Sequence, residues 1–298
     1  MQTCKVDEDA RACALDSLPI GASVLVVPPS SANAQCLNGE AYAFQVTRGG
    51  DAAATDKVHI ALQGGGACWT SKRGSFVPGC TQSLTPLQLS QLSQLPPSDE
   101  TRIDILYCSG DVHVGETERY RGRANVQSVL DWVAQQQTLM RDVQQIHLSG
   151  CSAGALGLQM LAPEMVRQLR QLRQLAPASD ADIRVTLDSF VGVFPPDAVP
   201  QLLQQYGLAP QASVEQILSD TLAQLPDVSF VQWNSTHDAV QIGFYDAVGV
   251  TLEGAAPRTV TPEQWAREAH DQMARVAQAH GNYSFREIPG ARHCFGPH

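Results

Sequence analysis

The sequence predicts an α/β fold, built on a mostly parallel central sheet with helices on both faces. Short runs of β-branched residues alternate with stretches of helical periodicity through most of the 298 residues. That alternation is typical of parallel strands joined by crossover helices. Hydrophobic residues make up 43% of the chain and charged residues 17%, a balance that supports a packed core and argues against disorder. We therefore expect residues 1–298 to form a single domain.

Seven apolar runs predict the strands of this sheet. Each run is short, rich in β-branched residues and followed by glycine, by a turn or by a helical pattern. In chain order they are residues 24–27, 58–62, 103–107, 146–148, 183–187, 230–233 and 283–288.

Three periodic stretches predict helices between these strands. In the stretch 126–139, valines and leucines recur on one face of a helix. The stretches 163–175 and 262–279 both begin with proline, which is favoured at the first position of a helix. Two further segments, 85–97 and 195–227, are interpreted as insertions that could form lids over a pocket. Plain surface helices explain both segments equally well.

Charge and cysteine content narrow the class of protein. The net charge of -10 disfavours binding to nucleic acid and to anionic lipid, and no apolar stretch is long enough to insert across a bilayer. The first residues contain no hydrophobic targeting core, so the protein is either cytosolic or an exported protein whose signal peptide was removed. An even set of eight cysteines without a Cys-x-x-Cys pair favours disulfides, and therefore a secreted or periplasmic location.

The strongest chemical signal is Gly150-Cys151-Ser152-Ala153-Gly154. It follows a predicted strand and precedes a helical run, which is the context that a G-x-S-x-G nucleophile elbow requires in an α/β-hydrolase. The glycines permit a sharp turn that exposes the serine, and the turn directs backbone N–H groups toward a developing oxyanion. Ser152 is therefore the predicted nucleophile.

A second glycine-rich segment predicts oxyanion donors. The run 58–62 leads directly into Gln63-Gly64-Gly65-Gly66-Ala67-Cys68-Trp69, the position at which this fold takes a donor from an earlier strand's loop. A phosphate-binding loop is disfavoured, because no Gly-Lys-Ser/Thr follows.

The serine needs a histidine base, and the histidine needs an orienting carboxylate. His293 follows a late strand and a turn, which is the usual position of the base in an α/β-hydrolase. His237 is the alternative. Asp238 and Asp188 both follow strands. Position alone favours Asp238, because the acid of this fold usually comes from a late strand, and leaves Asp188 open.

The residues resemble the pectin acetylesterase and Notum family of carboxylesterases, in particular its bacterial members. The matching motifs occur in order along most of the chain. They are Leu62-Gln-Gly-Gly-Gly-Ala-Cys-Trp69, Tyr107-Cys-Ser-Gly-Asp-Val-His-Val-Gly115, Arg121-Gly-Arg-Ala-Asn125, Gly150-Cys-Ser-Ala-Gly154, residues 234–241 and His293-Cys294.

This resemblance implies specific roles. The family's triad maps onto Ser152, Asp238 and His293, and its oxyanion donors map onto the backbone N–H groups around Gly65, Gly66 and Ala153. It also implies a disulfide between Cys68 and Cys80. Asp111 and Asn125 match family motifs as well, and a structural role explains them equally well.

A further disulfide, between Cys151 and Cys294, is argued from geometry. The two cysteines flank the nucleophile and the base, so contact between Ser152 and His293 would bring them together. A similar Cys-Ser, Asp, His-Cys arrangement occurs in the tannase and feruloyl esterase group, which is an alternative relative. The pairing of Cys4, Cys13, Cys36 and Cys108 stays open.

We therefore expect a serine carboxylesterase that needs no cofactor and no metal. Its substrate would be an ester of a small molecule, a polysaccharide or another polymer, with Trp69 in the pocket. A tannase-like or polyester hydrolase, an acyltransferase and a non-catalytic binding protein on the same fold are the alternatives. Acyl length and oligomeric state do not follow from the sequence.

Overall fold

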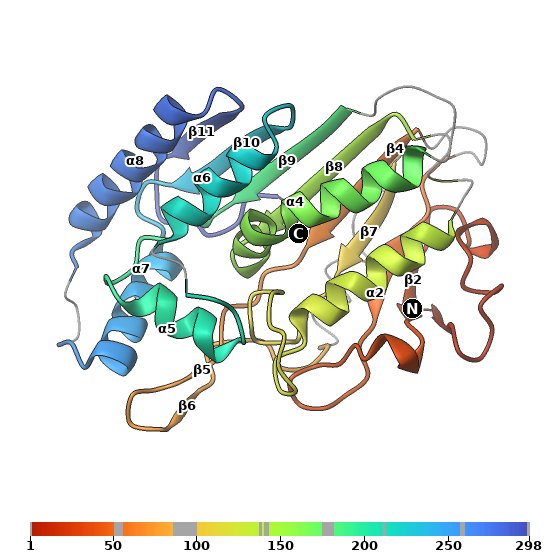
Figure 1. The fold of residues 1–298 in the computed structure, drawn as a ribbon, viewed down its shortest axis with the longest axis horizontal. Coiled ribbons are helices and arrows are strands. Elements are labelled where there is room, and N and C mark those ends of the chain that lie inside the picture. The colour runs from red at the N-terminus through yellow and green to blue at the C-terminus, as the bar shows by residue number, and fades with distance from the viewer. Residues whose placement is uncertain are drawn as a thin grey trace.

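The computed structural model describes residues 2–50, 56–85, 100–136, 139, 143–174, 182–210, 213–256 and 260–296. A nine-stranded sheet runs through this part of the chain in the order β1-β2-β3-β7-β4-β8-β9-β10-β11 (Figure 1). Its strands are β1 (Gln2–Lys5), β2 (Ser23–Val27), β3 (Phe44–Thr47), β4 (Lys57–Leu62), β7 (Thr101–Ile105), β8 (Gln145–Cys151), β9 (Asp182–Asp188), β10 (Ser229–Ser235) and β11 (Tyr283–Ile288).

The sheet is mostly parallel, as the sequence predicts. Strands β7, β4, β8, β9, β10 and β11 all run in one direction. Only β3 is antiparallel to its neighbours β2 and β7. Because parallel strands carry their loops at a common edge, the segments after β4, β8, β10 and β11 meet at one end of the sheet.

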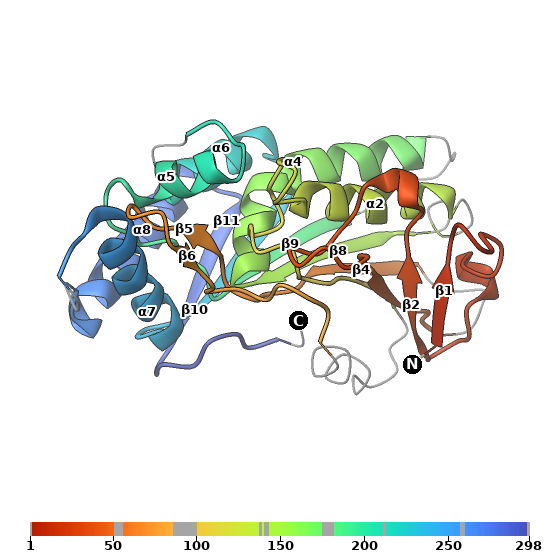
Figure 2. The same ribbon diagram turned by 90° about the horizontal axis from the view of Figure 1, so that it is seen from below.

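Helices cover the central strands (Figures 1 and 2). Figure 2 shows α2 (Gly122–Gln135) and α4 (Ala153–Gln174) on one side of the sheet, with α5 (Ala198–Gln205) and α6 (Val214–Gln224) beside them. Helix α7 (Ala239–Val248) follows β10 and continues into η3 (Gly249–Glu253), and α8 (Pro262–Ala279) packs against β11. The mostly parallel sheet with packed helices confirms the predicted fold class.

The predicted helix start at Pro163 is wrong. Helix α4 begins at Ala153, directly after the serine, and Pro163 lies inside it. A proline inside a helix has no N–H for the carbonyl four residues earlier, which here belongs to Gln159. The hydroxyl of Thr221 on α6 donates to that carbonyl at 2.5 Å and replaces the missing hydrogen bond.

The predicted start at Pro262 is right. Helix α8 spans Pro262–Ala279, with proline in its first turn. The Thr261 side chain accepts from the Gln264 N–H, and the Gln264 side chain accepts from the Thr261 N–H. This capping box satisfies two backbone groups at the helix end.

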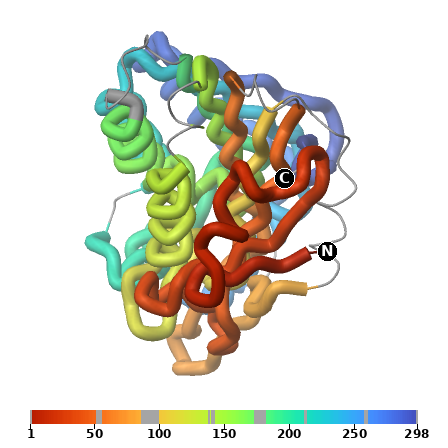
Figure 3. The backbone as a smooth tube through the Cα atoms, turned by 90° about the vertical axis from the view of Figure 1, so that its right-hand side faces the viewer, coloured from red at the N-terminus to blue at the C-terminus, as the bar shows by residue number. Residues whose placement is uncertain are grey.

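Four disulfides tie the loops to this framework, and no free cysteine remains. They join Cys4 to Cys13, Cys36 to Cys108, Cys68 to Cys80 and Cys151 to Cys294. The first two fasten the N-terminal segments, which form the near end of the molecule in Figure 3. Within the described residues, no helix combines the length and apolarity that crossing a membrane requires.

Candidate active site

Ser152 occupies a strained turn between β8 and α4. Its φ is +54°, in the left-handed region that non-glycine residues rarely adopt. The Ser152 N–H donates to the Asp188 carbonyl at 2.9 Å. A Cβ at Gly150 would lie 2.3 Å from the Gly154 carbonyl oxygen, and one at Gly154 would lie 2.0 Å from that of Leu62. Glycine is therefore required on both sides of the serine.

Asp238 holds His293 by its Nδ1. The Asp238 carboxylate is fully buried and lies 2.8 Å and 2.9 Å from His293 Nδ1 through its two oxygens. It caps α7 as well, because it accepts from the N–H groups of Val240 and Gln241 and from the Gln241 side chain. Since a carboxylate only accepts, Nδ1 carries the proton, and Nε2 is the free acceptor.

The second ring nitrogen of His293 is unpaired, and its side chain lines the same cavity as Ser152. His293 Nε2 is buried and has no hydrogen-bond partner among the described residues. Ser152 and His293 line the same cavity, and they also share a second, more open cleft. A buried nitrogen without a partner is costly, and such a nitrogen is available to accept a proton from a nucleophile.

The loop that carries His293 is anchored to Asp188. The Asp188 carboxylate accepts from the N–H groups of Phe295 and Gly296 at 2.7 Å and 3.0 Å. It also accepts from the Ser189 hydroxyl, which in turn accepts from the Cys294 N–H at 2.9 Å. Asp188 thus contacts both the serine elbow, through its carbonyl, and the histidine loop, through its carboxylate.

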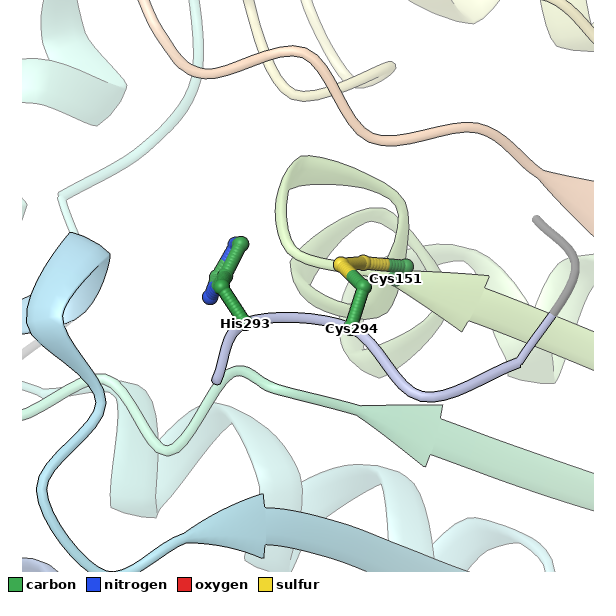
Figure 4. Close-up of side chains that lie close together, drawn as sticks. All are labelled: Cys151, His293 and Cys294. Atoms are coloured by element: carbon green, nitrogen blue, oxygen red, sulfur yellow. A yellow bond between two sulfur atoms is a disulfide. The ribbon is translucent and has the colours of Figure 1, made fainter. Parts of the chain in front are cut away.

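Cys151 and Cys294 form a disulfide beside the site (Figure 4). Their Cα atoms are 5.9 Å apart, within the normal range for a disulfide. The sulfur atoms and a ring nitrogen of His293 lie within 4.8 Å of one another. This group is not suited to a metal ion, because disulfide sulfurs are not thiolates.

The glycine loop after β4 turns its carbonyl groups away from the cavity. The Gly65 carbonyl accepts from the Thr81 N–H and the Gly66 carbonyl accepts from the Tyr107 hydroxyl, both at 2.8 Å. No described group accepts from the N–H groups of Gly65, Gly66 or Ala153. A Cβ at Gly66, where φ is +75°, would lie 2.0 Å from a backbone oxygen. The loop therefore has unpaired donors at Gly65 and Gly66, and both residues line the cleft that Ser152 also lines.

A buried histidine supports the same loop from behind. His113 Nε2 donates to the Gln63 carbonyl at 2.7 Å. Burial lowers the pKa of His113 to about 4, so the ring stays neutral at physiological pH. Asp111 accepts from the N–H groups of His113 and Gly122, and burial raises the pKa of its carboxyl.

The cavity beside Ser152 is apolar. Helices α5, α6 and α7 contribute part of its wall, so the predicted lid segment 195–227 supplies residues that line it. The lining includes Trp69, Val112, Leu156, Phe190, Val193, Phe194, Val199, Leu202, Leu203, Val214, Ile217, Phe244 and Val248. The Trp69 indole N–H donates to Thr251, so its ring faces the cavity with its polar group satisfied elsewhere.

The other residues that the sequence offered as site candidates have partners outside the Ser152, Asp238 and His293 group. The His237 ring lies 3.0 Å from the Thr236 hydroxyl rather than at Asp238. The Asn125 side chain exchanges two hydrogen bonds with the Gln35 backbone, which indicates a structural role. Segment 85–97 lies outside the described residues apart from Thr85.

Sequence reasoning did not find several residues of the site. Tyr107 and His113 hold the glycine loop, and Val240 and Phe244 line both hollows beside Ser152. The motif that contains Tyr107 and His113 was visible. Its contact with a loop some 40 residues earlier depends on the pairing of β4 with β7.

Comparison with known proteins confirms the resemblance seen in the motifs. A sequence model described as Pectinacetylesterase matches residues 98–193, which include the Ser152 elbow. No curated protein matches the chain. Two crystal forms of the Wnt deacylase Notum from Drosophila superpose with TM-scores of 0.55 and 0.53 at 17% and 18% identity. Each comparison covers 88% of this chain and 82% of the other, and at this identity it establishes the fold alone.

Proposed function

We propose that the protein is a serine carboxylesterase, with Ser152 as nucleophile, His293 as general base and Asp238 as the orienting acid. One observation carries the proposal. Ser152 on its strained turn and His293 with an unpaired Nε2 line one cavity, and His293 Nδ1 is held by a buried carboxylate. The match to the pectinacetylesterase model supports the same chemistry.

The reaction proceeds in two halves. His293 Nε2 takes the Ser152 proton as Oγ bonds to the ester carbonyl carbon, and the N–H groups of Gly65, Gly66 and Ala153 stabilise the oxyanion. The bond to the alcohol oxygen then breaks, and His293 returns the proton to the leaving alcohol. Water, deprotonated by His293, then attacks the acyl-enzyme. The bond between the acyl carbon and Ser152 Oγ breaks, His293 returns the proton to Oγ, and the acid is released.

The cavity favours an apolar acyl group. Its described lining is almost wholly aliphatic and aromatic. Burial of an alkyl chain there should stabilise the bound state by about 0.8 kcal/mol per CH₂ removed from water. An acetyl group would use little of this surface. We therefore expect preference for acyl chains of several carbons over acetate.

The four disulfides support a location in an oxidising compartment, because disulfides persist there. We accordingly propose that it is secreted or periplasmic, and that it acts on an ester encountered there.

The test is hydrolysis of p-nitrophenyl esters from acetate to palmitate by the wild type and by Ser152→Ala. We expect kcat/KM to rise from acetate toward a longer chain. The variant should lose on the order of 10⁶ in kcat. Labelling by a fluorophosphonate probe, with Ser152→Ala as the blank, provides an activity-independent readout.

An enzyme that hydrolyses none of these esters, and whose Ser152 does not react with the probe, would be a binding protein on this fold. Transfer of the acyl group to an added alcohol, in preference to water, would instead identify an acyltransferase.

A further inference from the structure

We infer that the open cleft beside Ser152 receives the alcohol portion of the ester, and that this alcohol is uncharged. The cleft is lined by Gly64, Gly65, Thr81, Val240, Phe244 and Cys294, and it shares Ser152 and His293 with the apolar cavity. We call it the alcohol cleft. The inference rests on the proposed function, because it divides the two arms of an ester between two hollows.

The division follows from the shape of the intermediate. The carbonyl carbon bonded to Ser152 carries three other groups: the oxyanion, the acyl chain and the alcohol oxygen. The unpaired amides of the glycine loop take the oxyanion, and the less open, apolar cavity accepts the acyl chain. The alcohol then occupies the remaining hollow that touches His293, which must protonate the leaving oxygen.

The chemistry of the alcohol cleft excludes a negative charge. Its described lining contains no lysine and no arginine. Besides Ser152 and His293, the polar groups are the Thr81 hydroxyl, the neutral amide of Gln63 and backbone atoms, while Val240 and Phe244 offer carbon. Val240 is 39% exposed, so this apolar surface is open to a ligand. A carboxylate would lose water without gaining a cation.

The neighbouring cation is engaged elsewhere. Arg292 precedes His293, yet its Nε donates to the Cys294 carbonyl at 3.1 Å and its guanidinium lies 5.5 Å from the Phe295 ring centroid. It does not line the cleft. The net charge of -10 further disfavours the approach of an anionic polymer.

A pair of matched esters tests the inference. Both carry butyrate, one on 4-hydroxybenzamide and the other on 4-hydroxybenzoate, which is anionic at neutral pH. After correction for uncatalysed hydrolysis, we expect kcat/KM to be at least about tenfold higher for the amide. The preference should persist at about 1 M salt, where the Debye length is roughly 3 Å and long-range repulsion is screened.

A substitution in the alcohol cleft provides a second test of the inference. Val240→Lys should reduce the preference to about threefold or less by supplying a cation, whereas the neutral control Val240→Leu should retain it. Equal rates for the two esters in the wild type, or a preference unchanged in Val240→Lys, would overturn the inference and leave the esterase proposal standing. If the wild type hydrolysed neither ester and did not react with the fluorophosphonate probe, both the inference and the esterase proposal would be overturned.

Discussion

Ser152 is one of six described non-glycine residues with a positive φ. A non-glycine residue at a φ of +54° costs roughly 1–2 kcal/mol in backbone strain. The hydrogen bond from its N–H to Asp188 and the close contacts of Gly150 and Gly154 hold it there. Such strain is concentrated at functional sites, and here the spacing of the two glycines made the position predictable.

Asp238→Asn tests the orienting role of the acid. The two N–H groups of α7 that Asp238 caps need an oxygen acceptor, so the new amide would turn its NH₂ toward His293. Nδ1 would then become the acceptor and Nε2 would carry the proton, which is the wrong tautomer for a base. We expect kcat to fall about 10⁴-fold with little change in KM, measured on a p-nitrophenyl ester.

His237→Ala is the matched control for that substitution. His237 is adjacent in sequence, and its ring contacts Thr236 instead of the acid. We expect its kcat to stay within about threefold of the wild type. A reversed result, with His237→Ala inactive and Asp238→Asn active, would reassign the base.

The C-terminal loop is the element on which the predicted catalysis depends most. Its anchors are the Cys151–Cys294 disulfide and the hydrogen bonds to Asp188 and Ser189. Removing the disulfide by Cys151→Ala with Cys294→Ala should let His293 drift from Ser152. A displacement of about 1 Å can reduce the rate about 10²-fold, and we expect a loss of that order in kcat.

The Cys36–Cys108 disulfide supplies the control. It also closes a long segment, with a separation of 72 residues, but does not line either hollow in the described structure. Replacing both cysteines with alanine should cost about 2–5 kcal/mol of stability while kcat at a permissive temperature stays near the wild-type value. Unfolding curves and kcat for both double variants separate the two effects; equal losses of kcat would contradict the positioning role.

Helix α4 shows how a sequence rule fails through a distant contact. Proline favours a helix start, yet Pro163 lies in the middle of α4 because the Thr221 hydroxyl satisfies the Gln159 carbonyl. Thr221→Val should leave that carbonyl unpaired and cost about 1–3 kcal/mol of unfolding free energy. Thr221→Ser keeps the hydroxyl and should lose less. Urea unfolding of the two variants measures the difference, and equal losses would mean that the methyl group matters instead.

Other elements were predictable to different degrees. Runs of β-branched residues predicted the six parallel strands, and helical periodicity predicted α8. The apolar residues of these elements are buried in the core. Strands β1 and β3 were not predicted. β1 has three of its four residues exposed, and β3 has only four residues, so neither shows an alternation that separates it from a loop.

At the scale of the whole molecule, those parts of the site were predictable whose residues lie close together in the sequence with a characteristic spacing. The Ser152 elbow and the glycine loop have such spacing, and the order of residues in the fold limited the choice of acid and base. Part of the cavity wall comes from α5, α6 and α7, which are separated from Ser152 by about 40 to 100 residues. Their arrangement depends on how helices pack over the sheet, which no local pattern specifies.

Burial of His113 in the interior of the molecule predicts that the free energy of unfolding depends on pH. Burial lowers the pKa of His113 to about 4, whereas the unfolded imidazole titrates near about 6.5. Between these values the unfolded chain binds a proton that the folded chain does not. The free energy of unfolding should therefore fall as the pH drops from about 6.5 to about 4, by at most about 3 kcal/mol, and His113 should contribute no pH dependence above that window. His113→Gln retains a donor for the Gln63 carbonyl and cannot titrate, so urea unfolding of both proteins across this range isolates the contribution. Wild-type and variant curves that stay parallel from pH 7 to pH 4 would show that His113 is not the group that titrates.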